Sequence, residues 1–214
     1  MFQRLCRNLP AYIRENLGIY TLVTSFFCLG IIAGAFLIRF SGEEQLGELN
    51  TTLALFFRGL KGETFKALKP VELLSASYRK NVLFLLITWL LGLAWFGFPL
   101  ILVTLMFKGF ALGFTVAFLV RRVALKGVVF GLAALLPHNF LFVPAYIAAA
   151  TAATSFSFLK LNDRLTKKKT DRNHYYRQYC YFMFSVLLLM LAGGLVEAYI
   201  TPVFMQLAAS IITL

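Results

Sequence analysis

Hydrophobic residues in this chain are gathered into long blocks, and short polar or basic stretches separate them. Five blocks each supply the roughly 17–25 apolar residues that one membrane crossing needs. They cover residues 19–38, 82–98, 100–120, 140–158 and 179–200. The pattern therefore predicts an all-α fold, a polytopic membrane helix bundle with about five spans, built as a single domain over residues 1–214.

One apolar stretch does not fit a simple crossing. Residues 127–159 carry no formal charge, and as one helix they would approach 50 Å, against a hydrocarbon core of about 30 Å. Pro137 removes a backbone donor within the stretch. The arithmetic favours a re-entrant half-helix over residues 127–136 that breaks at Pro137, with His138 and Asn139 at the break. The alternative is a tight hairpin on the outer side that does not dip into the membrane.

Polar residues at membrane depth are the candidate site residues. Lys108 lies about eight residues into its span, so its ammonium either snorkels to the interface or faces the bundle interior. Pro137 and Pro144 leave backbone groups unpaired nearby. The side chains of His138 and Asn139 can bond those groups. Alternatively, they form with Lys108 a polar patch for a translocated solute or proton.

Glu197 is the acidic candidate, near the outer end of the last span. It is expected to remain an interfacial carboxylate or to form a structural ion pair with a base at its own level. The bases expected at that level are Arg121, Arg122 and Lys126, whereas Lys108 is expected to lie deeper in the membrane.

Small residues predict close helix contacts. Three GxxxG pairs occur, at Gly30/Gly34, Gly109/Gly113 and Gly127/Gly131, and an alanine-rich strip follows at Ala145, Ala149, Ala153 and Ser157. Small residues four apart let two helix backbones approach closely in lipid. We expect the contacts to lie within one chain, and self-association into a homo-oligomer is the alternative.

The chain is strongly basic, with 21 Lys and Arg against 9 Asp and Glu and a formal net charge of +12. These bases flank the apolar blocks, where Lys and Arg set membrane orientation. Nucleic-acid binding would need a basic face on a soluble fold, so we expect no nucleic-acid partner. The basic N-terminus and the basic loop 160–178 predict two cytoplasmic segments, which places the N-terminus inside and the C-terminus outside.

Residues 41–80 would then form an extracytoplasmic loop. Apolar residues recur in it at helical spacings of three and four: Leu46, Leu49, Leu53, Phe56, Phe57 and Leu60. The spacing predicts an amphipathic helix that lies on the bilayer or packs over the bundle. That helix either closes the outer face or offers a docking surface to an extracytoplasmic partner.

Motifs of catalysis and metal binding are missing from the sequence. The three cysteines lie far apart, and no CxxC, GxSxG, HExxH or Walker pattern occurs. We therefore expect no metal, no cofactor, no catalytic residue and no enzymatic activity.

Five short segments, taken in order, resemble the stage II sporulation protein M family. They are RENLGIY, LFFRGLKGE, KGFALGFTVAFLV, PHNFLFVPA and VEAYITP. The matches are collinear and run from about Arg14 to Phe204. The family motif at PHNFLFVPA does not fix a histidine at the position of His138, which weakens a special role for that residue.

The resemblance implies a non-enzymatic membrane component of the engulfment machinery of endospore-forming bacteria. The family is associated with stage II sporulation proteins D and P, which cut septal peptidoglycan, and it is taken to anchor and recruit them at the septal, mother-cell membrane. The implied function is a scaffold for septal wall thinning and forespore engulfment. A transporter or permease-like subunit that uses the patch at Lys108, His138 and Asn139 is the alternative.

Overall fold

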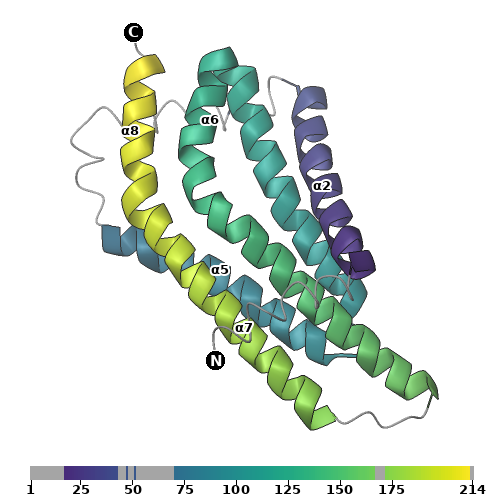
Figure 1. Ribbon diagram of the computed structural model, residues 1–214. Helices are drawn as coiled ribbons and strands as arrows, with labels where there is room; N and C mark the ends of the chain where they lie inside the picture. The colour runs from purple at the N-terminus through teal and green to yellow at the C-terminus, as the bar shows by residue number, and fades with distance from the viewer. Residues whose placement is uncertain (1–16, 43–46, 48–50, 52–69, 167–171, 213–214) are drawn as a thin grey trace.

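The computed structural model describes residues 17–42, 47, 51, 70–166 and 172–212, which are helical almost throughout (Figure 1). The elements follow in the order α2 (Leu17–Phe40), α5 (Pro70–Leu93), α6 (Gly97–Thr166), α7 (Arg172–Leu195), the π-helical turn η1 (Val196–Ile200) and α8 (Thr201–Ile212). No strand occurs in the described residues, so the all-α prediction is confirmed. In Figure 1, α7, η1 and α8 follow one another without a gap as one long helical rod.

Helix α6 is folded back on itself. Its 70 residues would span about 105 Å in a straight helix. Yet the ammonium of Lys108 lies 3.5 Å from the hydroxyl of Tyr146, which is 38 residues later. Figure 1 shows α6 rise as a teal segment, reverse at one end of the molecule and descend as a green one. We call residues Gly97–Arg122 the first limb of α6 and residues Gly131–Thr166 the second limb.

The second limb continues through Pro137 and Pro144 without interruption, so the predicted half-helix over residues 127–136 is wrong. The chain reverses before the prolines, and the helix continues beyond the uncharged stretch, to Thr166. A membrane helix tolerates proline where nearby groups satisfy the freed backbone. Pro137 leaves the carbonyl of Ala133, four residues earlier, without its main-chain donor, and in the same turn Asn139 Nδ2 donates to the carbonyl oxygen of Leu135 at 2.8 Å.

Helices long and apolar enough to cross a membrane account for most of the described residues. They are Leu17–Phe40, Gly97–Arg122, Gly131–Thr166 and His174–Ala208. These four segments contain the predicted spans 19–38, 100–120, 140–158 and 179–200. The last segment does not end at residue 200, because the helix continues through Pro202 into α8.

The remaining predicted span, 82–98, corresponds to α5, but this helix begins at Pro70 and ends at Leu93. Its first half is polar, with Glu72, Arg79 and Lys80 exposed, and α5 is not among the four apolar segments. Residues 70–80 belong to the extracytoplasmic loop 41–80 of the prediction, in which a second, weaker helical segment is expected over Glu63–Tyr78; they are helical and form the first half of α5. The amphipathic helix predicted earlier in that loop lies almost wholly outside the described residues.

Helix α2 packs against the first limb of α6 through glycines on both helices. A Cβ atom built on Gly30 would lie 2.2 Å from the carbonyl oxygen of Met106. Cβ atoms on Gly34, Gly109 and Gly113 would also come within 2.1–2.3 Å of a carbonyl oxygen on the opposite helix. Since later residues of α2 face later residues of α6, the two segments run parallel. Two of the three GxxxG pairs thus make the contact within one chain that the sequence predicts.

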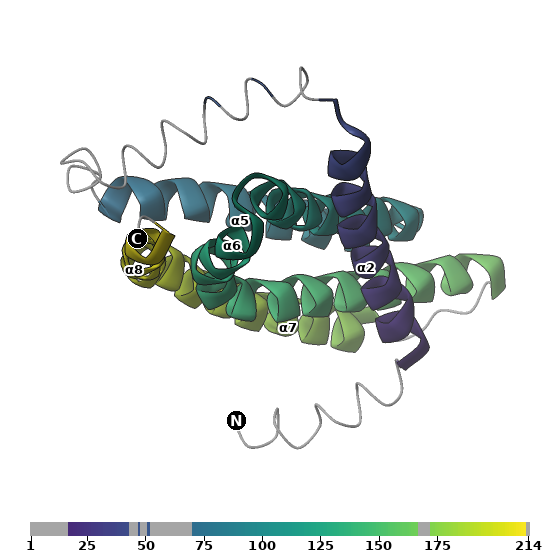
Figure 2. The same ribbon diagram turned by 90° about the horizontal axis from the view of Figure 1, so that it is seen from above.

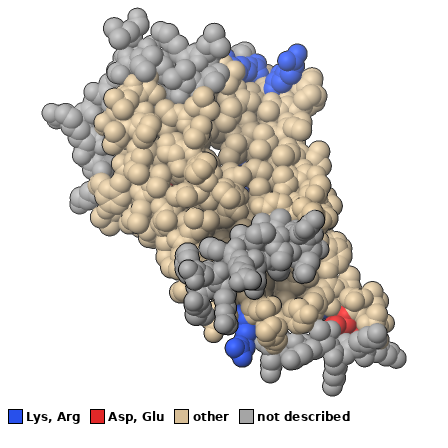
Figure 3. Space-filling model, viewed as in Figure 1, with Lys and Arg blue, Asp and Glu red and all other residues tan. Residues whose placement is uncertain are grey.

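The outer surface is apolar along its middle, as contact with lipid requires. Large side chains on the outer faces of three helices are more than half exposed: Leu29, Ile32, Phe107 and Leu188. In Figure 3, the Lys and Arg residues visible on one face gather towards the two ends of the molecule, with uncharged surface between them. Seen from above in Figure 2, α2 and α8 lie at opposite sides of the bundle, with α6 between them.

Candidate functional site

Five polar side chains meet inside the bundle, and we call them the polar network. Four helical segments contribute them: the first limb of α6, the second limb of α6, α5 and η1. In the order of their contacts, the members are Lys108, Tyr146, Asn81, Ser77 and Glu197.

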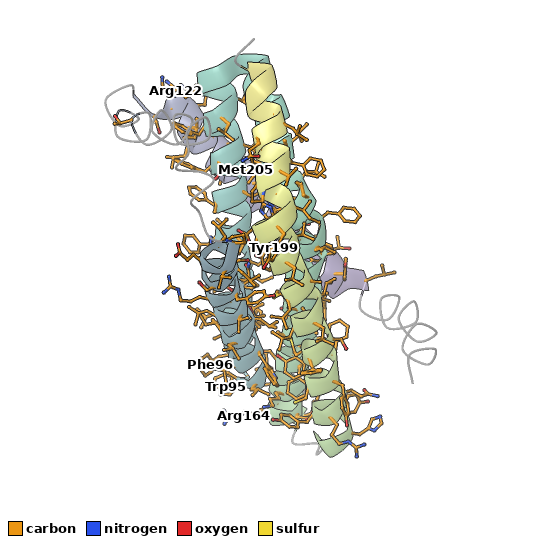
Figure 4. The ribbon with its side chains drawn as sticks, turned by 90° about the vertical axis from the view of Figure 1, so that its left-hand side faces the viewer. Trp95, Phe96, Arg122, Arg164, Tyr199 and Met205 are labelled. Carbon is orange, nitrogen blue, oxygen red and sulfur yellow. The ribbon has the colours of Figure 1, made fainter. Side chains whose placement is uncertain are left out.

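Lys108 and Tyr146 place one end of the network at mid-depth in the membrane. Fourteen residues separate Lys108 from Arg122, and fourteen separate Tyr146 from Lys160, about 21 Å of helix in each case. The hydrocarbon core extends only about 15 Å to either side of its centre. Figure 4 shows Arg122 and Arg164 at opposite ends of the long axis. If the Lys108–Tyr146 contact lies at the centre of the hydrocarbon core, Arg122 and Lys160 therefore lie beyond its two edges, at the level of the headgroups.

The ammonium of Lys108 faces the bundle interior instead of snorkelling to the interface. It lies 5.0 Å from the ring centroid of Phe84 and 4.8 Å from that of Tyr146, and it donates to the Tyr146 hydroxyl at 3.5 Å. The two rings meet edge to face, with centroids 4.9 Å apart. A desolvated cation over an aromatic face gains about 2 kcal/mol. Of the two predicted orientations of Lys108, the interior one is confirmed.

Three neutral side chains connect Lys108 to a carboxylate. The Tyr146 hydroxyl donates to Asn81 Oδ1, and Asn81 Nδ2 donates to Ser77 Oγ at 3.3 Å. Ser77 Oγ in turn donates to Glu197 Oε2 at 2.5 Å. Asn81 and Ser77 are only 4% and 1% exposed, so neither can exchange these bonds for water. Hydrogen bonds with no competing solvent fix the relative positions of the helices that they join.

Glu197 is bonded to Ser77 of α5, and its described contacts include neither Arg121 nor Arg122, so the predicted pairing with those two bases is wrong; Lys126 lies outside the residues whose side chains are described. Arg121, one of the expected partners, instead donates to backbone carbonyls at the end of α2, including that of Ser41 at 2.9 Å. The prediction failed because it treated Ser77 and its neighbours as an outer loop.

The π-helical turn η1 sets the position of Glu197. The Thr201 N–H donates to the carbonyl of Val196, five residues earlier, and the Thr201 hydroxyl bonds the same oxygen at 3.2 Å. Pro202 follows and has no N–H to donate, so a regular ladder cannot continue unbroken here. Single π turns of this kind are frequent at functional sites.

His138 and Asn139 form a second polar group beside η1. His138 Nδ1 lies 3.2 Å from Thr201 Oγ1, and Asn139 Nδ2 lies 3.3 Å from His138 Nε2. Since the Thr201 hydroxyl donates to Val196, it accepts from His138, which places the imidazole proton on Nδ1. The Nε2 atom is then an acceptor for Asn139. His138 therefore joins the second limb of α6 to the start of α8, and Asn139 bonds the His138 ring within the second limb.

The structure separates the patch that the sequence predicts at Lys108, His138 and Asn139. Lys108 bonds Tyr146 in the middle of the second limb, whereas His138 bonds Thr201 at the start of α8 and Asn139 bonds His138 and the carbonyl of Leu135. Sequence reasoning also missed Ser77, Asn81 and Tyr146. The available signal was the spacing of buried residues along α5 at Ser77, Asn81, Phe84, Thr88 and Gly92, which is helical although two members are strongly polar.

The chemistry of the network is that of two partly buried groups of opposite charge connected through hydrogen bonds. Among the described residues, no group of three or more His, Cys, Asp or Glu side chains could hold a metal ion. Lys108, Tyr146, Asn81, Ser77 and Glu197 each use a polar atom on another member of the network. The arrangement stabilises one packing of four helical segments.

Comparison with known proteins identifies the family. The chain belongs to the family described as Stage II sporulation protein M, whose family model matches residues 23–202. The match extends from α2 to the start of α8 and so includes the whole polar network. No curated protein and no solved structure gives a significant match to the chain. The family resemblance found in the sequence motifs is thus confirmed.

Proposed function

We propose that this member of the stage II sporulation protein M family is a non-enzymatic membrane scaffold of the engulfment machinery. It anchors the peptidoglycan-degrading stage II sporulation proteins D and P at the septal membrane, where the wall is thinned and the forespore is engulfed. The observation that carries the proposal is the family match over residues 23–202 of a helical bundle in which four segments are long and apolar enough to cross a membrane.

The internal contacts support a holding role. The polar network joins α5, both limbs of α6 and η1, and the glycine contacts fix α2 against the first limb. A scaffold needs a packing that does not change when a partner pulls on its exposed segments. Buried hydrogen bonds between helices provide such resistance, because opening them would leave polar groups unpaired in hydrocarbon.

The proposed orientation places the N-terminus in the cytoplasm and the C-terminus outside, in the mother-cell and septal membrane. Two features support it. The parallel course of α2 and the first limb of α6 requires a return crossing between them, and α5 lies there in the sequence. The segment 160–178 is strongly basic, as cytoplasmic segments are. Residues 43–69 then lie outside, and we assign to them the docking of the hydrolases.

Affinity purification from sporulating membranes tests the scaffold. A tagged chain should retain proteins D and P, and replacing residues 43–69 by a Gly/Ser linker of equal length should release them. A linker that replaces residues 167–171, on the cytoplasmic side, is the matched control and should retain both. If the intact chain retains neither hydrolase, the scaffold is wrong. If the 43–69 replacement retains both, only the docking segment is wrong.

A transport subunit is the second candidate, and the opposite charges of Lys108 and Glu197 inside the bundle favour it. Ionisable residues within membrane segments mark many ion and proton pathways. Proteoliposomes that contain the chain would then show a proton or solute flux that Lys108→Met abolishes. Flux equal to that of empty liposomes would eliminate this candidate and leave the scaffold intact.

A further inference from the structure

The turn between α5 and α6 presents an aromatic and basic cluster at one end of the molecule. Trp95 and Phe96 form the tip of this turn and are 41% and 54% exposed. Their rings are nearly perpendicular, with centroids 5.5 Å apart. The guanidinium of Arg164, near the end of the second limb of α6, lies 4.9 Å from the ring centroid of Trp95. Figure 4 shows these three residues together at the end opposite Arg122.

The turn is held in place by side chains of the second limb. Ser157 Oγ donates to the carbonyl of Ala94 at 2.8 Å and accepts from the Phe98 N–H at 3.2 Å. Lys160 Nζ donates to the carbonyl of Leu93 at 2.6 Å. These bonds cap the end of α5 and the start of α6, so the exposed aromatic tip rests on a rigid base.

The height of the cluster matches the boundary between acyl chains and headgroups. Ser157 is eleven residues beyond Tyr146 and Arg164 is eighteen beyond it, about 17 Å and 27 Å along the helix. With headgroups included, a bilayer extends about 20–22 Å from its centre. Since the limb is tilted in the bundle, the aromatic tip reaches the edge of the hydrocarbon and Arg164 reaches the phosphates (Figure 1). Trp at this level is typical of membrane interfaces.

The charge of the cluster specifies what it can bind. Arg164 lies four residues after Lys160, on the same face of the helix, and it is exposed. Asp163, the adjacent acid, is only 7% exposed. A guanidinium presents a planar set of donors that matches the oxygens of a phosphate. Stacking on Trp95 fixes that plane and leaves its edge available to a ligand.

We propose that Arg164, stacked on Trp95 and flanked by Lys160, binds the headgroup phosphate of one anionic phospholipid of the surrounding bilayer. Trp95 and Phe96 contact the upper part of its acyl chains. The headgroup of an anionic lipid carries a net negative charge, whereas that of a zwitterionic lipid does not. Each basic residue near the surface therefore raises the affinity for the anionic lipid by about fivefold. The lipid would remain bound at the turn between α5 and α6 as the protein diffuses in the membrane.

The sequence offers a direct reporter, because it contains only two tryptophans. Trp89→Phe leaves Trp95 as the single fluorophore. The exchange removes no described hydrogen bond: Trp89 Nε1 has no partner among the described residues, and the bond from Tyr179 goes to the main-chain carbonyl of Trp89. The protein is reconstituted into phosphatidylcholine bilayers that contain a fixed fraction of brominated phosphatidylglycerol or of brominated phosphatidylcholine. Quenching of Trp95 measures which lipid occupies the site.

From the quenching of Trp95 we expect the affinity for phosphatidylglycerol to be at least fivefold higher than the affinity for phosphatidylcholine. Arg164→Gln should reduce this preference for phosphatidylglycerol about fivefold. Arg177→Gln, which removes an exposed charge from the same end without an aromatic contact, should leave the preference unchanged. Equal quenching by both lipids overturns the proposal, as does an equal loss in the two Gln variants. If Trp89→Phe does not fold, thermal unfolding of the wild-type chain and of Arg164→Gln is measured in both lipids instead. Phosphatidylglycerol should stabilise the wild-type chain more than it stabilises Arg164→Gln. Equal stabilisation of the two chains overturns the proposal.

Discussion

Tyr146→Phe is the sharpest test of the polar network, because it removes one oxygen and leaves the ring in place. The Tyr146 hydroxyl donates to Asn81 Oδ1 and accepts from Lys108 Nζ. Asn81 is 4% exposed, so no water can replace the lost donor. The ring contacts with Phe84 and with the Lys108 ammonium are retained. The substitution therefore isolates the hydrogen bonds from the packing and from the cation–π contact.

The expected loss of unfolding free energy is about 1–3 kcal/mol. Hydrogen bonds between membrane helices contribute about 0.6 kcal/mol on average, so two bonds contribute about 1.2 kcal/mol. A buried polar group left without a partner costs about 1–3 kcal/mol. The lower end applies if Asn81 turns towards another partner, and the upper end applies if the packing holds it in place.

The measurement is reversible unfolding in bicelles or mixed micelles, with Tyr181→Phe as the matched control. Tyr181 is 57% exposed on α7, and the loss of its hydroxyl should change stability by less than about 0.5 kcal/mol. A double-mutant cycle with Asn81→Leu should give a coupling of at least 0.5 kcal/mol, as contacting residues do. If Tyr146→Phe matches its control, or the cycle shows no coupling, the network does not stabilise the bundle.

Three further outcomes follow from other contacts. Gly109→Leu should destabilise the protein by about 3 kcal/mol, because its Cβ would meet the carbonyl oxygen of Phe27 at 2.3 Å; Gly18→Leu, with no atom within 4 Å, should be tolerated in the same unfolding assay. Ser157→Ala should cost about 1–2 kcal/mol, since it leaves the Phe98 N–H unpaired and removes one of the two donors to the carbonyl of Ala94, the other being the Gly97 N–H; equal stability would refute the capping role. Arg164→Cys, in a chain whose native cysteines are replaced, should react with an impermeant maleimide only after the membrane is opened; labelling of intact cells would reverse the proposed orientation.

The apolar pattern was sufficient to predict the helical class and most of the membrane-crossing segments. Block 19–38 lies inside α2, and block 100–120 lies inside the first limb of α6; both of these segments extend only a few residues further. The glycine spacing also predicted close helix contacts correctly, because a residue without a Cβ atom lets the backbone of a neighbouring helix approach closely. These features depend on local composition, which a single sequence displays directly.

The reversal of α6 and the role of α5 could not be predicted in the same way. Pro137 looked like a break because proline removes a donor, but the helix continues through it, and the packing that allows this is visible only in the folded chain. Ser77 and Asn81 were not expected inside the bundle, because they are polar and their partners are distant in the sequence. In the folded chain Asn81 bonds Tyr146 and Ser77 bonds Glu197. The helical spacing of Ser77, Asn81 and Phe84 indicates one face of a helix, but it does not identify the distant partners that satisfy the polar members.

The bond between Ser77 and Glu197 also bears on how the protein is made. The two residues lie 120 positions apart, and Glu197 is in the last helical rod to be synthesised. At about 5–20 residues per second, the ribosome adds Glu197 roughly 6–24 s after Ser77. During that interval the polar half of α5 has no carboxylate partner and cannot take its final position in hydrocarbon. Insertion of this protein is therefore completed only when its final segment arrives, and a chain cut short before η1 would present α5 to the membrane's quality-control proteases.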